Sequence, residues 1–544
     1  MNLYMRKEKK VYAIFTAEAI VLLASTFIVI LGSLQLLDVN MKALAQSSTS
    51  IIIGSTSGDN APRTDNFKLT SGYTIEPVVW NLTLPSSITF DNENNMYIAE
   101  AGFVYGGLIP TPRILKVDNQ SGTISVLVDR NLNGPITDIE FYNGKLYVSH
   151  RGIISTVELQ TGLVKDIIVG LPNIGDHHNN QIAIGGPDNR IYFGQGEATN
   201  SGVVGEDNFR LGWTKTVPYF HDIPAKNITL TGQNFVTKNP LTAEPNDNAT
   251  TGAFVPFGTS TYAGQVIPGD IKCTGCILSA KLDGTDLKLV GWGFRSAYGM
   301  AFSPIDRTKL LVTVNGADER GSRPISDDIE KVYLIDISNA SELGKFYGWP
   351  DFFGNAQPVT DPKFQSPKGN NSQQLEFLIQ NHPPVEKPLA QLDIGAALAQ
   401  VDFSSFSSKK SNNTNNNNGS TNPFGFEGLA FISEFGIMVP ISHSSESIKK
   451  EGGEKIVGQK VVILNLQTGN YSDFVSLNGP DIGFRPVGIA YKQDESALYI
   501  ASIGKVEVRT TLPNNGTPLP NPVPWYYPNT GVIWKITKSF GNNS

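Results

Sequence analysis

The chain has 544 residues, with 43 Lys or Arg and 50 Asp or Glu. This mildly negative balance, without a basic run beyond the first ten residues, argues against nucleic acid as a partner. Gly (53 residues) and Pro (33 residues) are abundant and strong helical periodicity is scarce, which is typical of a β-rich protein. Length alone predicts about three domains, but internal repetition overrides that expectation.

Residues 1–45 are interpreted as a targeting segment outside the fold. Basic residues between Arg6 and Lys10 precede an uncharged apolar run from Ala19 to Leu37, and Ala43-Leu44-Ala45 fits a small-residue cleavage site. The run is long for a signal peptide and about as long as a membrane span, so a cleaved signal and an uncleaved membrane anchor remain alternatives. In both cases we expect residues 46 onward to be exported, either secreted or anchored at the cell surface.

Two further features agree with export. Cys273 and Cys276 lie in the sequence Cys-Thr-Gly-Cys, for which a structural disulfide is favoured over a metal or redox role, because no second Cys pair or nearby His completes a zinc site. Asn-x-Ser/Thr triplets, which are also common by chance in an Asn-rich chain, predict a glycoprotein; they include Asn81, Asn227, Asn248, Asn339 and Asn470.

One strand pattern recurs after a polar linker over residues 46–69. An apolar strand is followed by a turn, a Leu-Tyr-Ile-like strand, a loop, a third strand and often a fourth; the six copies begin at Ile88, Ile139, Ile182, Met300, Leu429 and Ile489. Six units of this kind predict an all-β fold, a six-bladed β-propeller with four-stranded blades over residues 70–540. The sixth unit lacks a fourth strand, and we expect Tyr73 to Val79 to complete it and close the ring.

Some assignments within the repeat are less regular. In the fifth unit, Leu429 to Phe431 is assigned to the innermost strand and Ile437 to Val439 to the second, while the fourth unit shows only three strands. Residues 198–270 interrupt the third unit and are expected to form a lid over the site or a packed side layer. The Asn/Ser-rich run 404–422 has the composition of a flexible loop.

The most reactive-looking side chains lie at the start of the third unit. Asp176, His177 and His178 directly precede a predicted hairpin, and a His beside an Asp at a strand mouth is a candidate general base. His177 ranks above His178, which is equally consistent with a packed neighbour, and Asp176 is equally consistent with a turn cap.

Equivalent positions of the six units form a ring on one face of a propeller. Before the expected innermost strands stand Arg295, Ser296, Glu427 and Arg485; after the second strands come Arg151, Gln195, Glu197, Asn315 to Asp318, His443 and Lys505. Two arginines at the same repeat position favour an anion or quinone-oxygen clamp over solvated loop charges.

Five segments resemble one known family, the soluble quinoprotein glucose dehydrogenases and sorbosone dehydrogenases. They match in order and approximate spacing over roughly residues 70–540: GDHHNNQIAIGGPDNRIYFGQG (175–196), GWGFRSAYGMAFSP (291–304), SDDIEKVYLI (326–335), YGWP (347–350) and FRPVGIAY (484–491). The resemblance implies a six-bladed propeller that binds pyrroloquinoline quinone (PQQ) and Ca²⁺, oxidises aldose-type sugars or alcohols, and passes electrons to an external acceptor.

The resemblance also implies roles for single residues. His177 would be the general base, Asp176 would orient it, and Arg295 would polarise the developing quinone oxyanion. Arg295, Ser296, Arg485 and His443 would contact the cofactor, and the backbone carbonyls around Asn315, Gly316 and Ala317 would hold Ca²⁺.

The chain departs from the family pattern at several of these positions. The family's glucose enzymes have Asn at Ser296, Pro at Ala317, Lys at His443 and a second Arg at Gly483, and a glutamine expected near Asn133 has no clear counterpart. These departures bear on PQQ affinity and on glucose as the substrate.

Two other function classes are consistent with a propeller. A calcium-dependent lactonase would use the carboxylates of Glu427, Asp318 and Asp176, with a channel calcium held mainly by side chains. A non-catalytic surface propeller would bind glycan or protein, and replacement of His177 by Ala would then leave every activity unchanged. Fold alone does not choose between these functions.

Overall fold

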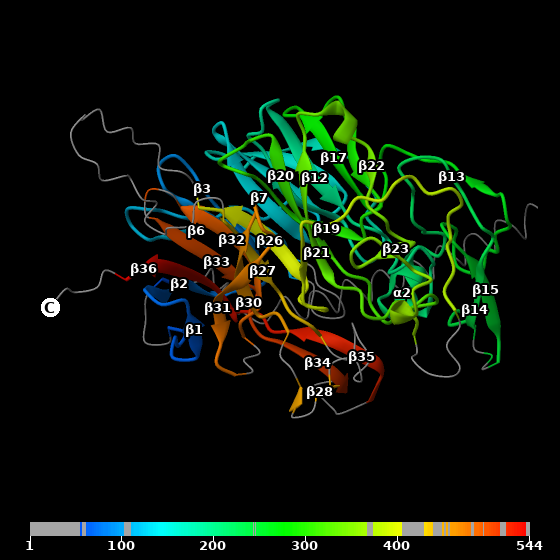
Figure 1. The fold of residues 1–544 in the computed structure, drawn as a ribbon. Helices are drawn as coiled ribbons and strands as arrows, with labels where there is room; N and C mark the ends of the chain where they lie inside the picture. Colours follow the sequence, from blue (N-terminus) through cyan, green and yellow to red (C-terminus); the bar gives the residue numbers. More distant parts are fainter. Residues whose placement is uncertain are drawn as a thin grey trace, which may run out of the picture. The chain divides into compact units, whose positions relative to one another are not determined.

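Six sheets of four or five strands follow one another along the chain and form the blades of a propeller (Figure 1). The computed structural model describes residues 55–56, 61–102, 110–242, 244, 246–366, 374–404, 429–438, 449–450, 453–454, 457–479, 483–492, 494, 496–511 and 518–539. The all-β, six-bladed prediction is confirmed.

The first three blades follow one another in the sequence, apart from one insertion and a short fifth strand that blade 3 receives from beyond the first three strands of blade 4. Blade 1 contains β3 (Pro85–Phe90), β4 (Met96–Glu100), β5 (Arg113–Val117) and β6 (Ile124–Val128). Blade 2 contains β7 (Ile136–Tyr142), β8 (Lys145–His150), β9 (Ile153–Glu158) and β10 (Val164–Ile168). Blade 3 contains β11 (Asn179–Ala183), β12 (Arg190–Gln195), β17 (Cys276–Lys281), β18 (Lys288–Trp292) and β22 (Lys345–Phe346), which pairs in parallel with β18.

The last three blades recruit strands from distant segments. Blade 4 contains β19 (Ser296–Phe302), β20 (Lys309–Asn315), β21 (Glu330–Asp336) and β25 (Ala390–Leu392). Blade 5 contains β26 (Leu398–Phe403), β27 (Leu429–Glu434), β30 (Lys460–Asn465), β31 (Tyr471–Leu477) and β1 (Phe67–Leu69). Blade 6 contains β32 (Pro486–Lys492), β33 (Ala497–Ser502), β36 (Gly531–Lys538) and β2 (Tyr73–Leu82).

The N-terminal strand closes the ring as predicted. β2 pairs antiparallel with β36, with Tyr73 opposite Lys538 at one end and Leu82 opposite Gly531 at the other. The pairing supplies the fourth strand of blade 6, so β36 is not left as an open edge.

The strand assignment in the fifth unit was wrong. The innermost strand is β26, and β27, expected to be innermost, is the second strand, while residues 435–438 form no strand. The prediction failed because residues 404–428 separate β26 from β27, whereas the repeat pattern assumes a short hairpin there. Blade 4 also has a fourth strand, β25, which the pattern missed because a long connection separates it from β21.

Turn chemistry accounts for the regular hairpins. Asn143 and Gly144 join β7 to β8 with φ angles of 49° and 80°. Positive φ at both central residues is what a type I′ turn requires, and Asn-Gly is the sequence that adopts it at least cost. The same logic places Asn189, with φ of 53°, just before β12.

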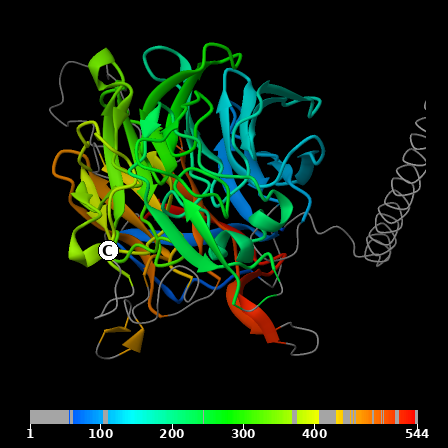
Figure 2. The same ribbon diagram turned by 90° about the vertical axis from the view of Figure 1, so that its right-hand side faces the viewer.

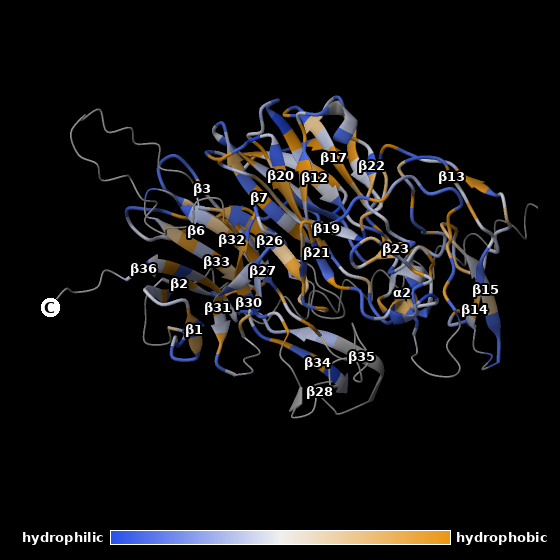
Figure 3. Cartoon of the chain, viewed as in Figure 1, coloured by the Kyte–Doolittle hydropathy of each residue, from blue (hydrophilic) through white to orange (hydrophobic). Residues whose placement is uncertain are grey.

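Apolar faces pack between neighbouring blades and form the core. In the junction of blades 1 and 2, for example, Tyr97 and Ile114 pack with Ile139 and Val148, and all four are at most 1% exposed. Figure 3 shows the apolar residues along the strands and the polar residues mainly in the connections. Burial of these side chains supplies the main favourable term for folding.

The insertion between β12 and β17 packs on the side of the propeller. It contains α2 (Glu206–Arg210), α3 (Trp213–Thr216), β13 (Ile228–Thr229), β14 (Asn234–Lys238), β15 (Asn248–Gly252) and β16 (Val266–Ile267). Buried Ile228, Leu230 and Phe254 share one apolar cluster with Trp292 and Trp349. These contacts form a packed layer in this part of the insertion, and the expectation of a lid over the site stays a prediction. The disulfide between Cys273 and Cys276, at the end of the insertion, is confirmed.

The remaining elements are short pairs and turns. They are η1 (Ala340–Glu342), β23 (Phe352–Phe353), β24 (Gln357–Pro358), η2 (Pro362–Phe364), β28 (Lys449–Lys450), β29 (Gly453–Glu454), β34 (Val506–Thr511) and β35 (Pro518–Tyr526). Figures 1 and 2 show the hairpin of β34 and β35 extending from the same side of the blades in both views.

The predicted targeting segment 1–45 lies outside the described residues, as does the Asn/Ser-rich run beyond Ser404. Within the part of the chain that the structure describes, no helix is long and apolar enough to cross a membrane.

Candidate active site

The six innermost strands line two cavities, one at each end of the channel. The first residues of these strands and the loops that lead into them line a cavity of about 260 Å³, here called the site cavity. The later residues of the same strands line a cavity of about 1050 Å³, here called the distal cavity. The candidate catalytic residues of the third unit lie in the site cavity.

Apolar and uncharged side chains dominate the site cavity. Its polar lining residues include Asp176, His177, His178, Asn180, Tyr298 and Asn315. Among the lining residues that the structure describes there is one carboxylate, that of Asp176, and no Lys or Arg. The described lining is therefore matched to an uncharged ligand better than to an anion.

A buried glutamate faces the candidate base. His177 precedes β11, and its side chain is 21% exposed. Its Nδ1 lies 2.8 Å from Oε1 of Glu197, which is fully buried, and its backbone N–H donates to the carbonyl of Glu197 at 3.1 Å. Nδ1 of His177 and both carboxylate oxygens of Glu197 make no hydrogen bond among the described residues, so the contact is electrostatic. A carboxylate at this distance would stabilise the imidazolium that forms when the ring accepts a proton.

The pair is held in its uncharged form by its surroundings. Burial, together with the smaller effect of the nearby positive charge of Arg295, lowers the pKa of His177 to about 3. Burial also raises the pKa of Glu197 well above its usual range, although Arg295 opposes that shift. Desolvation dominates both shifts because it disfavours each charged form.

Asp176 has other partners than the one expected from the sequence. Its Oδ2 accepts from Nη2 of Arg320 at 2.6 Å, and its Oδ1 accepts from Nδ2 of Asn208 at 3.0 Å. The carboxylate 2.8 Å from His177 Nδ1 is that of Glu197, and the orienting role implied for Asp176 stays a prediction. Asp176 still lines the cavity beside His177.

Arg295 lies behind the residues that line the site cavity. Its Nη2 lies 2.8 Å from Oδ2 of Asp318 and 3.1 Å from Oδ1 of Asn200, and its Nε lies 3.5 Å from Oε1 of Glu197. Neither Arg295 nor the neighbouring, fully buried Ser296 belongs to the described cavity lining. In this arrangement Arg295 supports Glu197 directly and the cavity only through it.

The predicted calcium loop follows β20 and meets the same cavity. Oδ1 of Asn315 is buried without a hydrogen-bond partner among the described residues, and Asn315 lines the cavity. The amides of Gly316 and Ala317 donate to Glu330 and Asp328 at 2.8 and 2.7 Å, which fixes the loop. An unpaired amide oxygen is a type of ligand that Ca²⁺ prefers, so Asn315 is a candidate ligand of that ion.

The described residues do not match the carboxylates of PQQ. The guanidinium of Arg485 lies over the ring of Phe435 at 5.0 Å, and its Nη1 donates to the carbonyls of residues 435–437 at 3.1 Å. Burial lowers the pKa of Arg485 to about 10. Phe435 lines the cavity and Arg485 does not, and His443 lies outside the described residues. The lining thus supplies a base and apolar walls for a flat ring system but no cation for its acidic groups.

Two carboxylates of the lactonase alternative, those of Asp176 and Asp318, meet at the guanidinium of Arg320. Asp318 binds Arg295 and Arg320, Asp176 binds Arg320, and Glu427 lies outside the described residues. Among the described residues there is no group of three or more His, Cys, Asp or Glu side chains placed to hold a metal ion.

Sequence reasoning left two of the site's main residues without a role. Glu197 was recognised at a ring position after the second strand of the third unit, but nothing local paired it with His177. Arg320 was not singled out at all, although it binds Asp176, Asp207 and Asp318. The sequence signal for a role of Arg320 in the site was its position shortly after Ala317 of the predicted calcium loop.

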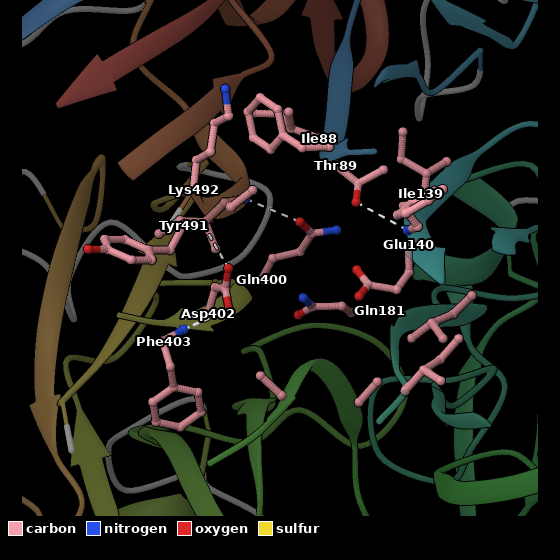
Figure 4. A pocket seen from close by; sticks show the side chains of 18 of the residues that line it. Ile88, Thr89, Ile139, Glu140, Gln181, Gln400, Asp402, Phe403, Tyr491 and Lys492 are labelled. Carbon is pink, nitrogen blue, oxygen red and sulfur yellow. Dashed lines mark hydrogen bonds between the residues drawn. The ribbon is translucent and has the colours of Figure 1, made fainter. Parts of the chain in front are cut away.

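The distal cavity has a different character (Figure 4). Its described lining includes five carboxylates and two cations: Asp91, Asp138, Glu140, Asp402 and Asp494, with Arg307 and Lys492. Figure 4 shows Glu140, Gln181, Gln400 and Asp402 pointing toward the middle of this cavity from three strands. Burial raises the pKa of Asp138 and of Asp402 to about 6.

No protein-family model matches the sequence, and no curated protein is significantly similar to it. The fold is similar to the holo form of the pyranose dehydrogenase PQQ domain from Coprinopsis cinerea, with 14% identity, a TM-score of 0.51, and coverage of 89% of this chain and 100% of that one.

Two further solved structures have lower TM-scores. A carbohydrate-active enzyme of family AA12 from Trichoderma reesei is 14% identical, with 89% and 100% of the two chains covered and a TM-score of 0.49. A putative oxidoreductase (glucose dehydrogenase) from Thermus thermophilus is 15% identical, with 86% and 100% covered and a TM-score of 0.45. At these identities the likeness is one of fold.

Proposed function

We propose that this chain is a sugar or alcohol dehydrogenase of the quinoprotein type, with His177 as the general base. The observation that carries the proposal is the cavity-lining His177 backed by the fully buried Glu197 at 2.8 Å. The quinoprotein class, with PQQ and Ca²⁺, follows from the sequence resemblance and is supported by the fold shared with a PQQ domain.

Three residues would take part in proton transfer, namely His177, Glu197 and Arg295. The nitrogen of His177 that is not against Glu197, Nε2, would take the proton of a substrate hydroxyl as its carbon is oxidised. Glu197 would stabilise the resulting imidazolium, and Arg295, 3.5 Å from it, would hold Glu197 in place. The Asn315 loop would hold Ca²⁺ at the cavity wall. A general base of this kind contributes roughly 10²–10⁴-fold to the rate.

The setting of the reaction is part of the proposal. We infer that residues 46 onward are exported, free or tethered by the N-terminal segment, and that an external acceptor receives the electrons. The cation-free cavity lining favours uncharged sugars or alcohols over acidic ones as substrates.

The first test is titration of the purified protein with PQQ in the presence of Ca²⁺, followed by a panel of aldoses and alcohols. We expect saturable binding seen by absorbance, and substrate-driven bleaching of the oxidised quinone that His177→Ala abolishes. Absence of binding at micromolar PQQ would contradict the quinoprotein class.

A second candidate is a non-catalytic propeller that binds an uncharged glycan. The described lining favours it because apolar walls with a few hydroxyl, amide and imidazole groups suit a neutral sugar. This function predicts sugar binding, measured by calorimetry, without PQQ and without any turnover.

A further inference from the structure

Arg320 joins three carboxylates around the candidate base. It lies between β20 and β21, and its side chain is 14% exposed. Its Nη2 lies 2.6 Å from Oδ2 of Asp176, its Nη1 lies 2.6 Å from Oδ2 of Asp207, and its Nε lies 3.0 Å from Oδ2 of Asp318. All three nitrogens of the guanidinium are thus engaged, in the fork geometry that suits Arg and not Lys.

The three carboxylates belong to separate parts of the chain. Asp176 precedes His177 in the loop before β11, Asp207 lies in α2 of the insertion, and Asp318 follows the calcium loop and is shared with Arg295. Asn208, the neighbour of Asp207 in α2, donates from Nδ2 to Asp176 at 3.0 Å. The insertion therefore contacts the loop of the base twice, once directly and once through Arg320.

Without Arg320, Asp176 and Asp207 would each lose an ion pair of 2.6 Å, and Asp318 would keep its ion pair with Arg295. Like charges in a poorly solvated site repel one another, so Asp176 and Asp207 would move apart. This movement would change the surroundings of His177.

We propose that Arg320 is a positioning residue that clamps α2 and Asp176 around His177, which makes this part of the insertion a fixed wall of the site. The inference deepens the proposed function, on which the role of His177 as base rests. The clamp consists of three ion pairs, so it can be tested without measuring dehydrogenase activity.

The charges that face His177 predict a specific signature. Arg295 and Arg320 lower its pKa, Asp176 and Asp318 raise it, and Glu197 lies at its Nδ1. Loss of the Arg320 charge leaves the two aspartates less opposed, so the pKa of His177 rises. A residue with a purely structural role would not move this value in a folded variant.

The test compares Arg320→Met and Arg320→Lys with Arg190→Met in the full-length protein. Arg190 is a matched control because it is 8% exposed and pairs with Asp286 in blade 3, away from the site. Amide hydrogen exchange of residues 206–210 reports on the clamp. NMR titration of labelled histidines, assigned with His177→Asn, reports on the base.

We expect Arg320→Met to speed the exchange of α2 by about tenfold and to raise the pKa of His177, with Arg320→Lys intermediate and Arg190→Met unchanged at both sites. If Arg320→Met does not fold, Asp207→Asn removes one arm of the clamp and should speed the exchange of α2 alone. Folded Arg320 and Asp207 variants with wild-type exchange and titration would overturn the proposal. An absence of dehydrogenase activity in the wild type would contradict the proposed function and leave both readouts intact.

Discussion

The two cavities of the channel are built from the same six strands, yet they differ in charge and in the way polar groups are satisfied. In the site cavity His177 and Glu197 form a pair that burial keeps uncharged, and Asn315 retains an unpaired oxygen among the described residues. In the distal cavity Asp138 accepts from Ser87, Ile182 and Gln400 at 2.7, 2.8 and 2.7 Å.

The site cavity thus contains a polar atom that a ligand could bind, whereas the hydrogen bonds of Asp138 in the distal cavity hold the blades together. The three donors to Asp138 come from blades 1, 3 and 5, so this carboxylate ties blades together across the channel. Gln181 likewise accepts from Met300 and Val401 at 2.9 and 3.1 Å and donates to the carbonyl of Val401. Buried polar groups that are fully bonded stabilise a fold, while unpaired ones are available to a ligand.

The largest effect expected is on turnover, from His177→Asn in the site cavity. Removing the base should lower kcat/KM by about 10²–10⁴-fold while unfolding by urea stays close to wild type. Steady-state kinetics with the best substrate of the panel would measure this. An unchanged kcat/KM would contradict the role of His177 as the general base, and with it the functional difference between the two cavities.

The second prediction concerns Glu197→Gln, which preserves shape and removes the acidic group that would become charged and stabilise the imidazolium once His177 accepts a proton. The fall in kcat should be smaller than for His177→Asn, at the lower end of the same range of roughly 10²–10⁴-fold. Asp176→Asn is the matched control, since its carboxylate pairs with Arg320 and not with His177 Nδ1. A larger loss in Asp176→Asn than in Glu197→Gln would support the orienting role of Asp176.

The third prediction is a loss of stability from Asp138→Ala in the distal cavity. Three buried donors would lose their acceptor, at a cost of about 3 kcal/mol or more in the free energy of unfolding. Urea denaturation followed by tryptophan fluorescence would measure it. Asp138→Asn, which keeps an acceptor oxygen, should lose less of the free energy of unfolding. Equal losses in the two variants would argue against a role of Asp138 in tying the blades together.

The fourth prediction is that the histidines of the site cavity and Asp402 of the distal cavity change stability with pH in opposite directions. The pKa values of His177 and His178 are lowered to about 3, so the folded state binds fewer protons and stability rises as pH increases from about 3 to 6.5. The pKa of Asp402 is raised to about 6, so the folded state binds more protons and stability falls as pH increases from about 4 to 6.

Variants separate these contributions in the window between pH 4 and 6. His177→Asn should make the rise of the unfolding free energy with pH shallower, and Asp402→Asn should make it steeper. Urea midpoints at half-unit pH steps would measure both slopes. A change of the same sign in the two variants would refute the opposed contributions.

The smallest effect is expected from Glu140→Gln in the distal cavity. Burial and the neighbouring Asp138 and Asp402 raise the pKa of Glu140 well above its usual range, so the neutral amide resembles the protonated acid that it replaces. Turnover and stability at neutral pH should stay at wild-type values. A loss of turnover would show that the distal cavity takes part in the reaction.

The amino-acid sequence by itself determined the six-bladed fold, the closing strand, the disulfide and the position of His177 beside the channel. These features depend on local signals: strand alternation, Asn-Gly turns, the repeat and the spacing of two cysteines. Only the tertiary structure decided that Glu197 and not Asp176 meets His177, that Arg295 and Arg320 share Asp318, and that β26 is the innermost strand of blade 5. The partners of buried charges depend on which strand ends and inserted segments lie next to each other across the blades. No local pattern along the chain encodes the distances between such segments.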